Sequence, residues 1–118
     1  MSKISDGKFG ERAACIYLST KGYEVLERNW HCRYGEIDIV ARKNNRLVFV
    51  EVKMRSQSDV MEFQDLVGAS KLGKLRSSID MYLYSKQLCT AEWRLDGVYV
   101  IRDPEKLHFR HFQGLLED

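Results

Sequence analysis

Three residues that could do chemistry together lie on two neighbouring predicted strands: Asp38, Glu51 and Lys53. They fall within the run YGEIDIVARKNNRLVFVEVK, residues 34–53. Asn44-Asn45 predicts a two-residue turn in this run, because asparagine tolerates positive φ angles. Such a turn fixes the register of the two strands. The opposed residues are then, from the turn outward, Arg42 and Leu47, Val40 and Phe49, Asp38 and Glu51, and Glu36 and Lys53.

Alternation of residue types predicts one aliphatic face and one partly ionic face for this hairpin. The aliphatic face holds Ile37, Ile39, Val48, Val50 and Val52. The other face is apolar at the turn and ionic toward the open end. Opposed Cβ atoms lie only ~4.5–5.5 Å apart, and like charges there are destabilising. Asp38 and Glu51 therefore need a cation between them, a shared proton, or exposure to water.

A divalent cation fits this pair of acids best. Carboxylate oxygens are hard ligands that suit Mg²⁺ or Mn²⁺, and such ions keep several waters and accept phosphate oxygens. Lys53, two residues after Glu51 on the same face, would point toward the water shell of the ion. There an ammonium can orient an attacking water or stabilise charge on a phosphate. The hairpin therefore predicts a metal-dependent site for phosphate chemistry.

A predicted helix over residues 5–21 precedes the hairpin. Its apolar face is expected to hold Phe9, Ala13, Ile16, Tyr17 and Thr20, with Gly22 closing the helix at the C′ position. Glu11 falls beside Leu18, at the border of the apolar arc. A third carboxylate is therefore expected at the edge of the buried face.

The remaining segments predict an α/β fold. Residues 23–31 and 92–102 predict strands, and residues 106–112 predict a last, shorter strand after a turn at Asp103-Pro104. Residues 66–86 predict a second helix, whose apolar stripe is Leu66, Ala69, Leu72, Leu75, Ile79, Tyr82 and Leu83. The order helix, strand, hairpin, helix, strand, strand favours a mixed central sheet flanked by helices.

Length and composition restrict the class of protein. The 118 residues, 44% of them apolar, predict one domain spanning 1–118. The net charge of +2 means that any affinity for nucleic acid must come from where the charges lie. Three cysteines without zinc-ligand spacing argue against a disulfide framework and a zinc site. Because no apolar stretch is long enough for a signal peptide or a membrane span, we expect a cytoplasmic protein without a membrane partner.

The spacing of Asp38 and Glu51-Val52-Lys53 resembles the D…E-x-K arrangement of the restriction-endonuclease-like nucleases, the PD-(D/E)-x-K group. Longer stretches resemble the uncharacterised bacterial YraN-like family, whose members look like small relatives of Holliday-junction resolvases. These stretches are GKFGERAACIYLSTKGYEVLERNW, YGEIDIVARKNNRLVFVEVKMRS, LVGASKLGKLRSSIDMYL and WRLDGVYV. The sequence departs from the family pattern at Gly68-Ala69, where Thr-Pro is common, and at Gly97, where a β-branched residue is usual.

This resemblance implies a restriction-endonuclease-like core and a role for each matching residue. Asp38 and Glu51 would be the metal ligands, Lys53 the third catalytic position, and Glu11 an additional acid aimed at the same ion. Glu36 and Arg55 belong to the motif without an assigned step. The implied activity is Mg²⁺- or Mn²⁺-dependent hydrolysis of DNA, with branched DNA as the leading substrate. Symmetric cutting of a junction needs two active sites, so a homodimer is expected.

Simpler interpretations stay open for each of these features. The acids and Lys53 could be a solvated hairpin end, and Glu11 a solvated residue at a helix border. The run Lys71, Lys74 and Arg76 is interpreted as a solvated helix face. Arg94 and Asp96 are interpreted as a structural pair or as a support that orients Lys53. A different class of function is a nucleic-acid-binding or scaffold module that keeps the fold without catalysis.

Overall fold

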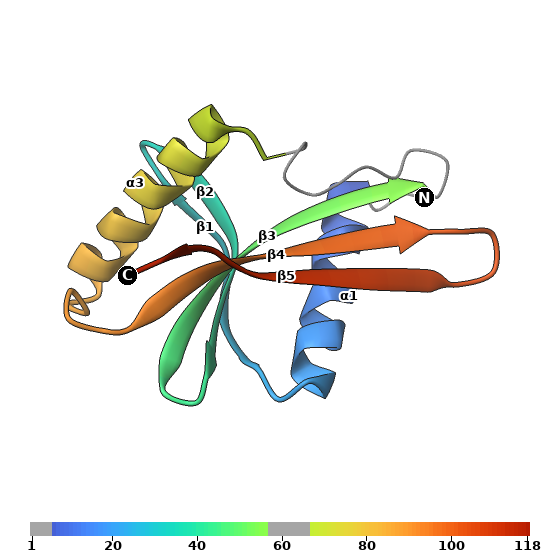
Figure 1. Cartoon of the computed structure of the whole chain (residues 1–118), viewed down its shortest axis with the longest axis horizontal. Helices are drawn as coiled ribbons and strands as arrows, with labels where there is room; N and C mark the ends of the chain where they lie inside the picture. Colours follow the sequence, from blue (N-terminus) through green and yellow to red (C-terminus); the bar gives the residue numbers. More distant parts are fainter. Residues whose placement is uncertain (1–5, 57–66) are drawn as a thin grey trace, which may run out of the picture.

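In the part of the chain that the structure describes, a five-stranded sheet carries one helix on each face (Figure 1). The structure is a computed structural model that describes residues 6–56 and 67–118. The strands are β1 (Glu24–Cys32), β2 (Gly35–Lys43), β3 (Arg46–Ser56), β4 (Trp93–Arg102) and β5 (Leu107–Glu117). The helices are α1 (Asp6–Thr20) and α3 (Ala69–Ser85).

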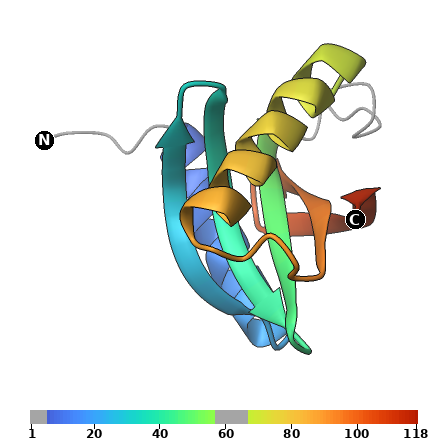
Figure 2. The same cartoon turned by 90° about the vertical axis from the view of Figure 1, so that its left-hand side faces the viewer.

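The strands follow their sequence order across the sheet, β1-β2-β3-β4-β5. Every neighbouring pair is antiparallel except β3 and β4, which are parallel. A parallel pair needs a crossover connection, and α3 lies in that connection. Figure 2 shows α1 behind the sheet and α3 in front of it. The predicted α/β class, with a mixed sheet flanked by helices, is confirmed, and this arrangement is consistent with a restriction-endonuclease-like core.

The hairpin turn between β2 and β3 has the predicted chemistry. Asn44 and Asn45 both have positive φ angles, of 52° and 64°. The ladder runs from Lys43 opposite Arg46 to Ile39 opposite Val50, in the predicted register. The turn residues therefore place β2 and β3 without a slip, since a one-residue slip would turn every side chain to the other face.

Two hydrophobic clusters, one on each face, hold the helices to the sheet. Leu75, Ile79, Tyr82 and Leu83 of α3 pack with Phe49, Leu95 and Tyr99 on one face. Ala14 and Leu18 of α1 pack with aliphatic side chains of the central strands on the other, namely Ile39, Ala41, Val48, Val50, Val98 and Val100. The sheet is therefore a central layer that is apolar on both sides, as strands between two helical layers must be.

The buried face of α1 differs from the predicted one. The residues that face the sheet are Gly10, Ala14 and Leu18, whereas Ile16 is 62% exposed. Small residues are needed because the helix lies close to β3: a Cβ on Gly10 would sit 3.0 Å from the Cβ of Met54. The end of the helix is as predicted, since Gly22 has φ +89° and Tyr23 N–H donates to Leu18 O.

Two other predicted boundaries change. α3 begins at Ala69 after an N-cap at Gly68, and the predicted Leu66 lies outside the described residues. Ala69 is exposed, so the buried stripe starts later than predicted. β5 extends to Glu117 and not to residue 112, because a bulge lets the strand continue past Gly114, which has φ +71°.

Arg94 and Asp96 form the structural pair that the sequence suggested. Arg94 Nε lies 2.9 Å from one oxygen of Asp96, and His111 Nε2 lies 2.7 Å from the other. Gly114 N–H also donates to Asp96, which is 0% exposed. These donors hold the pKa of Asp96 below its usual value despite burial. Within the described residues this network ties β4 to β5.

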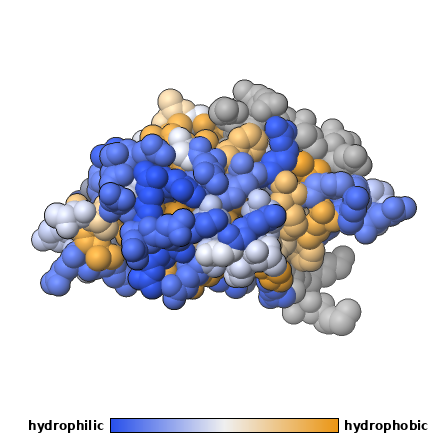
Figure 3. All heavy atoms as spheres, turned by 60° about the horizontal axis from the view of Figure 1, so that its bottom comes forward, coloured by the Kyte–Doolittle hydropathy of each residue, from blue (hydrophilic) through white to orange (hydrophobic). Residues whose placement is uncertain are grey.

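Polar side chains dominate the surface. Hydrophilic residues cover most of the face drawn in Figure 3, and the hydrophobic ones gather mainly on its right-hand half. Neither α1 nor α3 is long and apolar enough to cross a bilayer, and the same holds for all helical residues within 6–56 and 67–118.

A leucine at Gly10 should push α1 away from β3. We expect the Gly10→Leu variant to lose about 1–3 kcal/mol of unfolding free energy, because overpacking forces backbone and side-chain shifts. Gly7→Leu is the matched control on the same helix, since a Cβ at Gly7 meets nothing within 4 Å. Urea denaturation measures both, and equal midpoints for the two variants would contradict the close approach of α1 to the sheet.

Candidate functional site

The strands β2 and β3 separate where the acids begin. Their ladder ends at Ile39 and Val50, one pair before the predicted pair of Asp38 and Glu51. The Asp38 side chain continues the pairing instead, since Val52 N–H donates to Asp38 Oδ2 at 2.8 Å. β2 remains paired with β1 as far as Gly35. The sheet therefore forks at Asp38, and the fork opens space between β2 and β3.

The fork also changes which way the side chains of β2 point. Ile37 and Ile39 were predicted on one aliphatic face, but Ile37 packs in the α3 cluster and Ile39 in the α1 cluster. Regular alternation would keep residues two apart on one face. The alternation therefore breaks at Asp38, between the two isoleucines. The Asp38 carboxylate lies close to that of Glu11, which comes from α1.

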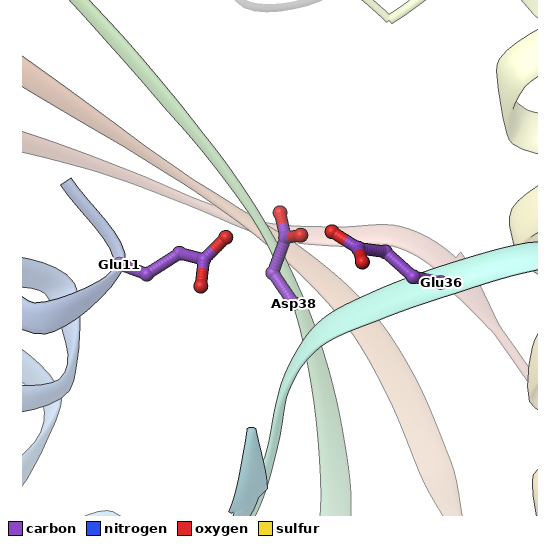
Figure 4. A group of neighbouring side chains, drawn as sticks. All are labelled: Glu11, Glu36 and Asp38. Carbon is purple, nitrogen blue, oxygen red and sulfur yellow. The ribbon is translucent and has the colours of Figure 1, made fainter. Parts of the chain in front are cut away.

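Three carboxylates meet at the fork. Glu11 reaches in from α1, and Glu36 and Asp38 reach in from β2 (Figure 4). One oxygen of each lies within 4.8 Å of the others. Asp38 is only 7% exposed, and Glu11 and Glu36 are half-buried. We name Glu11, Glu36 and Asp38, together with the adjoining Glu51, the acid cluster.

Glu51 adjoins Asp38 from the opposite side of the fork. Its residue is 4% exposed, and both its negative charge and a side-chain hydrogen bond with it help to raise the pKa of Asp38. The two side chains thus lie on the same side, as the register predicted, although the backbones have already parted. Of the three remedies for opposed carboxylates, the shared proton is the one that the ion-free chain can use.

Burial and repulsion raise the pKa of Asp38 to about 8. The largest cause is desolvation, followed by the negative charge of Glu51, while the Val52 N–H acts in the opposite direction. Burial also raises the pKa of Glu11, and a side-chain hydrogen bond from Asn29 partly offsets it. Around neutral pH, Asp38 is therefore held in its protonated form until a positive charge replaces that proton.

One oxygen of the cluster has no partner. Glu11 Oε1 is buried and makes no hydrogen bond within the part of the chain that the structure describes. A buried acceptor without a donor costs about 1–3 kcal/mol. The Glu11 carboxylate lies with those of Glu36 and Asp38 in a group whose nearest oxygens are within 4.8 Å of one another, a set of hard donors suited to Mg²⁺ or Mn²⁺. The residues at the fork therefore fit a divalent cation.

Two lysines flank Glu51. Lys53 Nζ lies 3.6 Å from Glu51 Oε1, and Lys71 Nζ lies 3.8 Å from Glu51 Oε2. The predicted pairing of Lys53 with Glu36 is wrong, because the ladder ends before this pair. Glu36 Oε2 lies 3.3 Å from His31 Nδ1 instead.

The sequence interpretation missed three residues at the site. Glu36 had no assigned step, yet it belongs to the acid cluster. Lys71 was interpreted as a solvated residue, whereas Arg76 of the same run does turn away, with its Nε 3.4 Å from Asp80. Asn29 has φ +52° within β1, opposite the fork, and bonds to Glu11. Asparagine tolerates a positive φ, but the residue type alone did not indicate that Asn29 adopts one inside a strand.

Comparisons with known proteins find relatives across the chain. The sequence model of a family described as "Uncharacterised protein family UPF0102" matches residues 10–100. The UPF0102 protein TW312 of Tropheryma whipplei is 42% identical over 118 residues, which cover 98% of this chain and 97% of the relative. UPF0102 protein FP2501 of Flavobacterium psychrophilum is 40% identical, covering 91% of this chain and 89% of the relative.

The raised pKa of Asp38 predicts how the stability of the metal-free protein changes with pH. The folded state holds this proton more tightly than the unfolded chain, whose carboxyl has a pKa near 3.8. The resulting stability is fully present below that value and is lost as the pH rises through about 8. In EDTA, the melting temperature of the wild type should therefore fall between about pH 4 and about pH 8 and level off above that range.

Asp38→Asn should remove most of this fall, because an amide does not titrate. Asp80→Asn is the matched control, since Asp80 is exposed and pairs with Arg76 on the surface of α3. It should keep the wild-type slope. Asp96 does not interfere in this range, because its lowered pKa affects stability only as the pH falls into the acid range. Equal slopes for wild type and Asp38→Asn would refute the buried, protonated Asp38.

Proposed function

Because the chain belongs to the uncharacterised protein family UPF0102, we propose its function from the site itself: hydrolysis of DNA phosphodiesters that depends on Mg²⁺ or Mn²⁺. The observation that carries the proposal is the acid cluster. Buried carboxylates face one another at the fork, and the Glu11 oxygen among them has no hydrogen-bond partner in the described chain. An arrangement that costs stability in the ion-free protein is expected where a positive charge is to be bound.

Each carboxylate of the acid cluster has a proposed role in binding the cation. Asp38, Glu51 and Glu11 would hold the cation, and Glu36 lies close enough to hold one of its waters. A cation bound there would supply Lewis-acid activation of water and charge neutralisation at the phosphate. Asp38 would give up its proton on loading, so affinity for the ion should rise with pH. The Val52 N–H fixes the Asp38 carboxylate in place for this role.

Lys53 is the proposed catalytic residue outside the ligand set. Its ammonium lies 3.6 Å from Glu51 and is partly exposed, so it can reach both the acid cluster and an incoming phosphate. From that position it can orient an attacking water or stabilise charge that develops in the transition state. Glu51 holds Lys53 in position before substrate arrives.

The positions of the basic residues allow DNA binding although the chain is nearly neutral. A hollow of about 530 Å³ beyond the fork is lined by Lys53, Arg55 and Arg102. Phosphate contacts supply most of the affinity of proteins for DNA, and they need positive charge at the site more than over the whole surface. DNA is thus the proposed substrate. Its branched form and a homodimeric enzyme are proposed by resemblance to the resolvases alone.

A second candidate is a nucleic-acid-binding or scaffold module without catalysis. The feature in its favour is the raised pKa of Asp38, which lowers the negative charge at the fork near neutral pH. In this alternative the cations around the fork bind nucleic acid and the acid cluster is inert. Metal binding and a rate that depends on Asp38 separate the two candidates.

Mg²⁺ or Mn²⁺ should stabilise the folded protein. Preferential binding to the native state adds RT ln(1 + [L]/Kd), which reaches about 2.7 kcal/mol at a hundredfold excess over Kd. Glu51→Gln should lose most of this gain, because it removes the charge of a proposed ligand. Differential scanning fluorimetry at pH 8 measures it, with Asp80→Asn as the charge-matched control. A melting temperature that ignores both ions up to millimolar concentrations contradicts the metal site.

Purified protein should cut DNA in the presence of Mn²⁺. The assay compares branched, flapped, duplex and single-stranded substrates with an EDTA control. Asp38→Ala should abolish cutting, and Lys53→Met should lower its rate by orders of magnitude while leaving Mn²⁺ affinity nearly unchanged. Lys106→Met, an exposed lysine at the β4–β5 turn, should cut like the wild type. If no substrate is cut and Lys53→Met changes only DNA affinity, the binding module replaces the nuclease.

A further inference from the structure

Two adjoining hollows lie between the β1–β2 turn and α3. Figure 2 shows this turn beside the helix. The first hollow, of about 250 Å³, is lined by Glu36, Lys71 and Lys74 among others, and the second, of about 360 Å³, by Met81 and Tyr84. Both are lined by Tyr34, so they meet at that ring. We name this surface the α3 groove, defined by Tyr34, Glu36, Lys71, Lys74, Met81 and Tyr84.

The first hollow joins the acid cluster. Glu36 belongs to both, and Lys71 lines the hollow while its Nζ lies 3.8 Å from Glu51. Lys74, one turn further along α3, is exposed. Two lysines leading away from a site that handles phosphate are suited to the phosphates that follow the one being cut.

The second hollow offers aromatic rings where the lysines end. Tyr34 is 39% exposed and Tyr84 is 75% exposed. Arg33 fixes the Tyr34 ring, since its guanidinium lies 4.9 Å from the ring centroid and its Nη2 donates to the hydroxyl at 2.8 Å. The neighbouring Tyr82 already serves the core, where its ring packs against Phe49. Tyr84 therefore adds an exposed ring that packing against the sheet does not require.

We propose that the α3 groove binds single-stranded DNA that leaves the acid cluster. Lys71 and Lys74 contact phosphates, and successive bases stack on Tyr34 and Tyr84. Lysines that follow the backbone and rings that receive bases are the two components of single-strand recognition. Lys71 and Tyr84 are thirteen residue steps apart, which is about 20 Å along the helix. Duplex DNA cannot use the rings, because its bases are already stacked on one another.

This inference rests on the proposed nuclease function and makes it more specific. It assigns the substrate class as DNA with an unpaired segment beside the bond that is cut, such as a flap or an open junction arm. Binding through the groove needs no divalent ion. It can therefore be measured in EDTA, without any cleavage.

The test is fluorescence anisotropy of labelled oligothymidine in EDTA. The double variant Tyr34→Ala/Tyr84→Ala should weaken binding about tenfold or more, since one stacked base contributes about 1–3 kcal/mol. Tyr84→Trp should retain binding, because it keeps a stacking surface. Ile16→Ala, an exposed apolar residue on α1, is the control and should bind like the wild type. Affinity for a duplex of equal length should not change in the tyrosine variants.

A second measurement tests the lysines. Lys74→Ala should reduce the slope of log affinity against log salt by about 0.7, the value for one phosphate of a single strand. Lys106→Ala removes the same charge at the β4–β5 turn and should leave the slope unchanged. Thermal unfolding confirms that each variant is folded.

Three results would overturn the proposal. They are unchanged single-strand affinity in the double tyrosine variant, an equal loss for duplex and single strands, and a dimer in solution that Tyr84→Ala dissociates. The last would assign the groove to a second copy of the chain. The two proposals can fail separately. If the protein cuts DNA with Mn²⁺ but the double tyrosine variant binds single strands normally, the nuclease proposal stands and the groove proposal falls. Tyrosine-dependent binding without any cutting keeps the groove and leaves the binding module.

Discussion

The hydrogen bond from Val52 N–H to Asp38 Oδ2 is the interaction on which the site depends. It replaces the next backbone rung between β2 and β3, so the two strands can part without leaving this amide of β3 unpaired. Where the strands separate, Glu11 of α1 and Glu36 of β2 lie close to Asp38. One side chain thus ends a ladder, opens a fork, and fixes its own carboxylate at the centre of the acid cluster.

Asp96 and Asp38 are both buried, but they differ in the donors around the carboxylate and in the direction of the pKa shift. Asp96 is fully buried, but Arg94, His111 and the Gly114 N–H surround it with donors, and its pKa falls. Asp38 is similarly buried with one backbone donor and three carboxylates nearby, and its pKa rises to about 8. Evolved cores satisfy buried polar groups, and the exceptions concentrate at functional sites. On this contrast we base the proposal that the fork is functional, whereas Asp96 is held in a satisfied network.

The sequence predicted the parts of the molecule that follow from local chemistry. Asn44-Asn45 gave the turn, the turn gave the register, and strand and helix periodicities gave the α/β order. The prediction failed where a tertiary contact overrides a local rule. The close approach of α1 to Met54 requires Gly10 on its buried face, and the exposed Ile16 lies outside that face. The fork at Asp38 breaks strand alternation, and so Glu36 joins the cluster while Lys53 pairs with Glu51. Lys71 reaches the site only through the packing of α3, which no spacing within the hairpin could reveal.

Crystals of the protein soaked with Mn²⁺ at pH 8 provide the most direct measurement of the central claim, that the fork is built to bind a divalent cation. The anomalous difference map at the manganese absorption edge locates the ion without reference to activity. The account predicts a strong peak among the carboxylates of Glu11, Asp38 and Glu51, absent in crystals of Asp38→Asn. A map with no peak at the fork under saturating Mn²⁺, or with peaks only at surface acids such as Asp80, would contradict it.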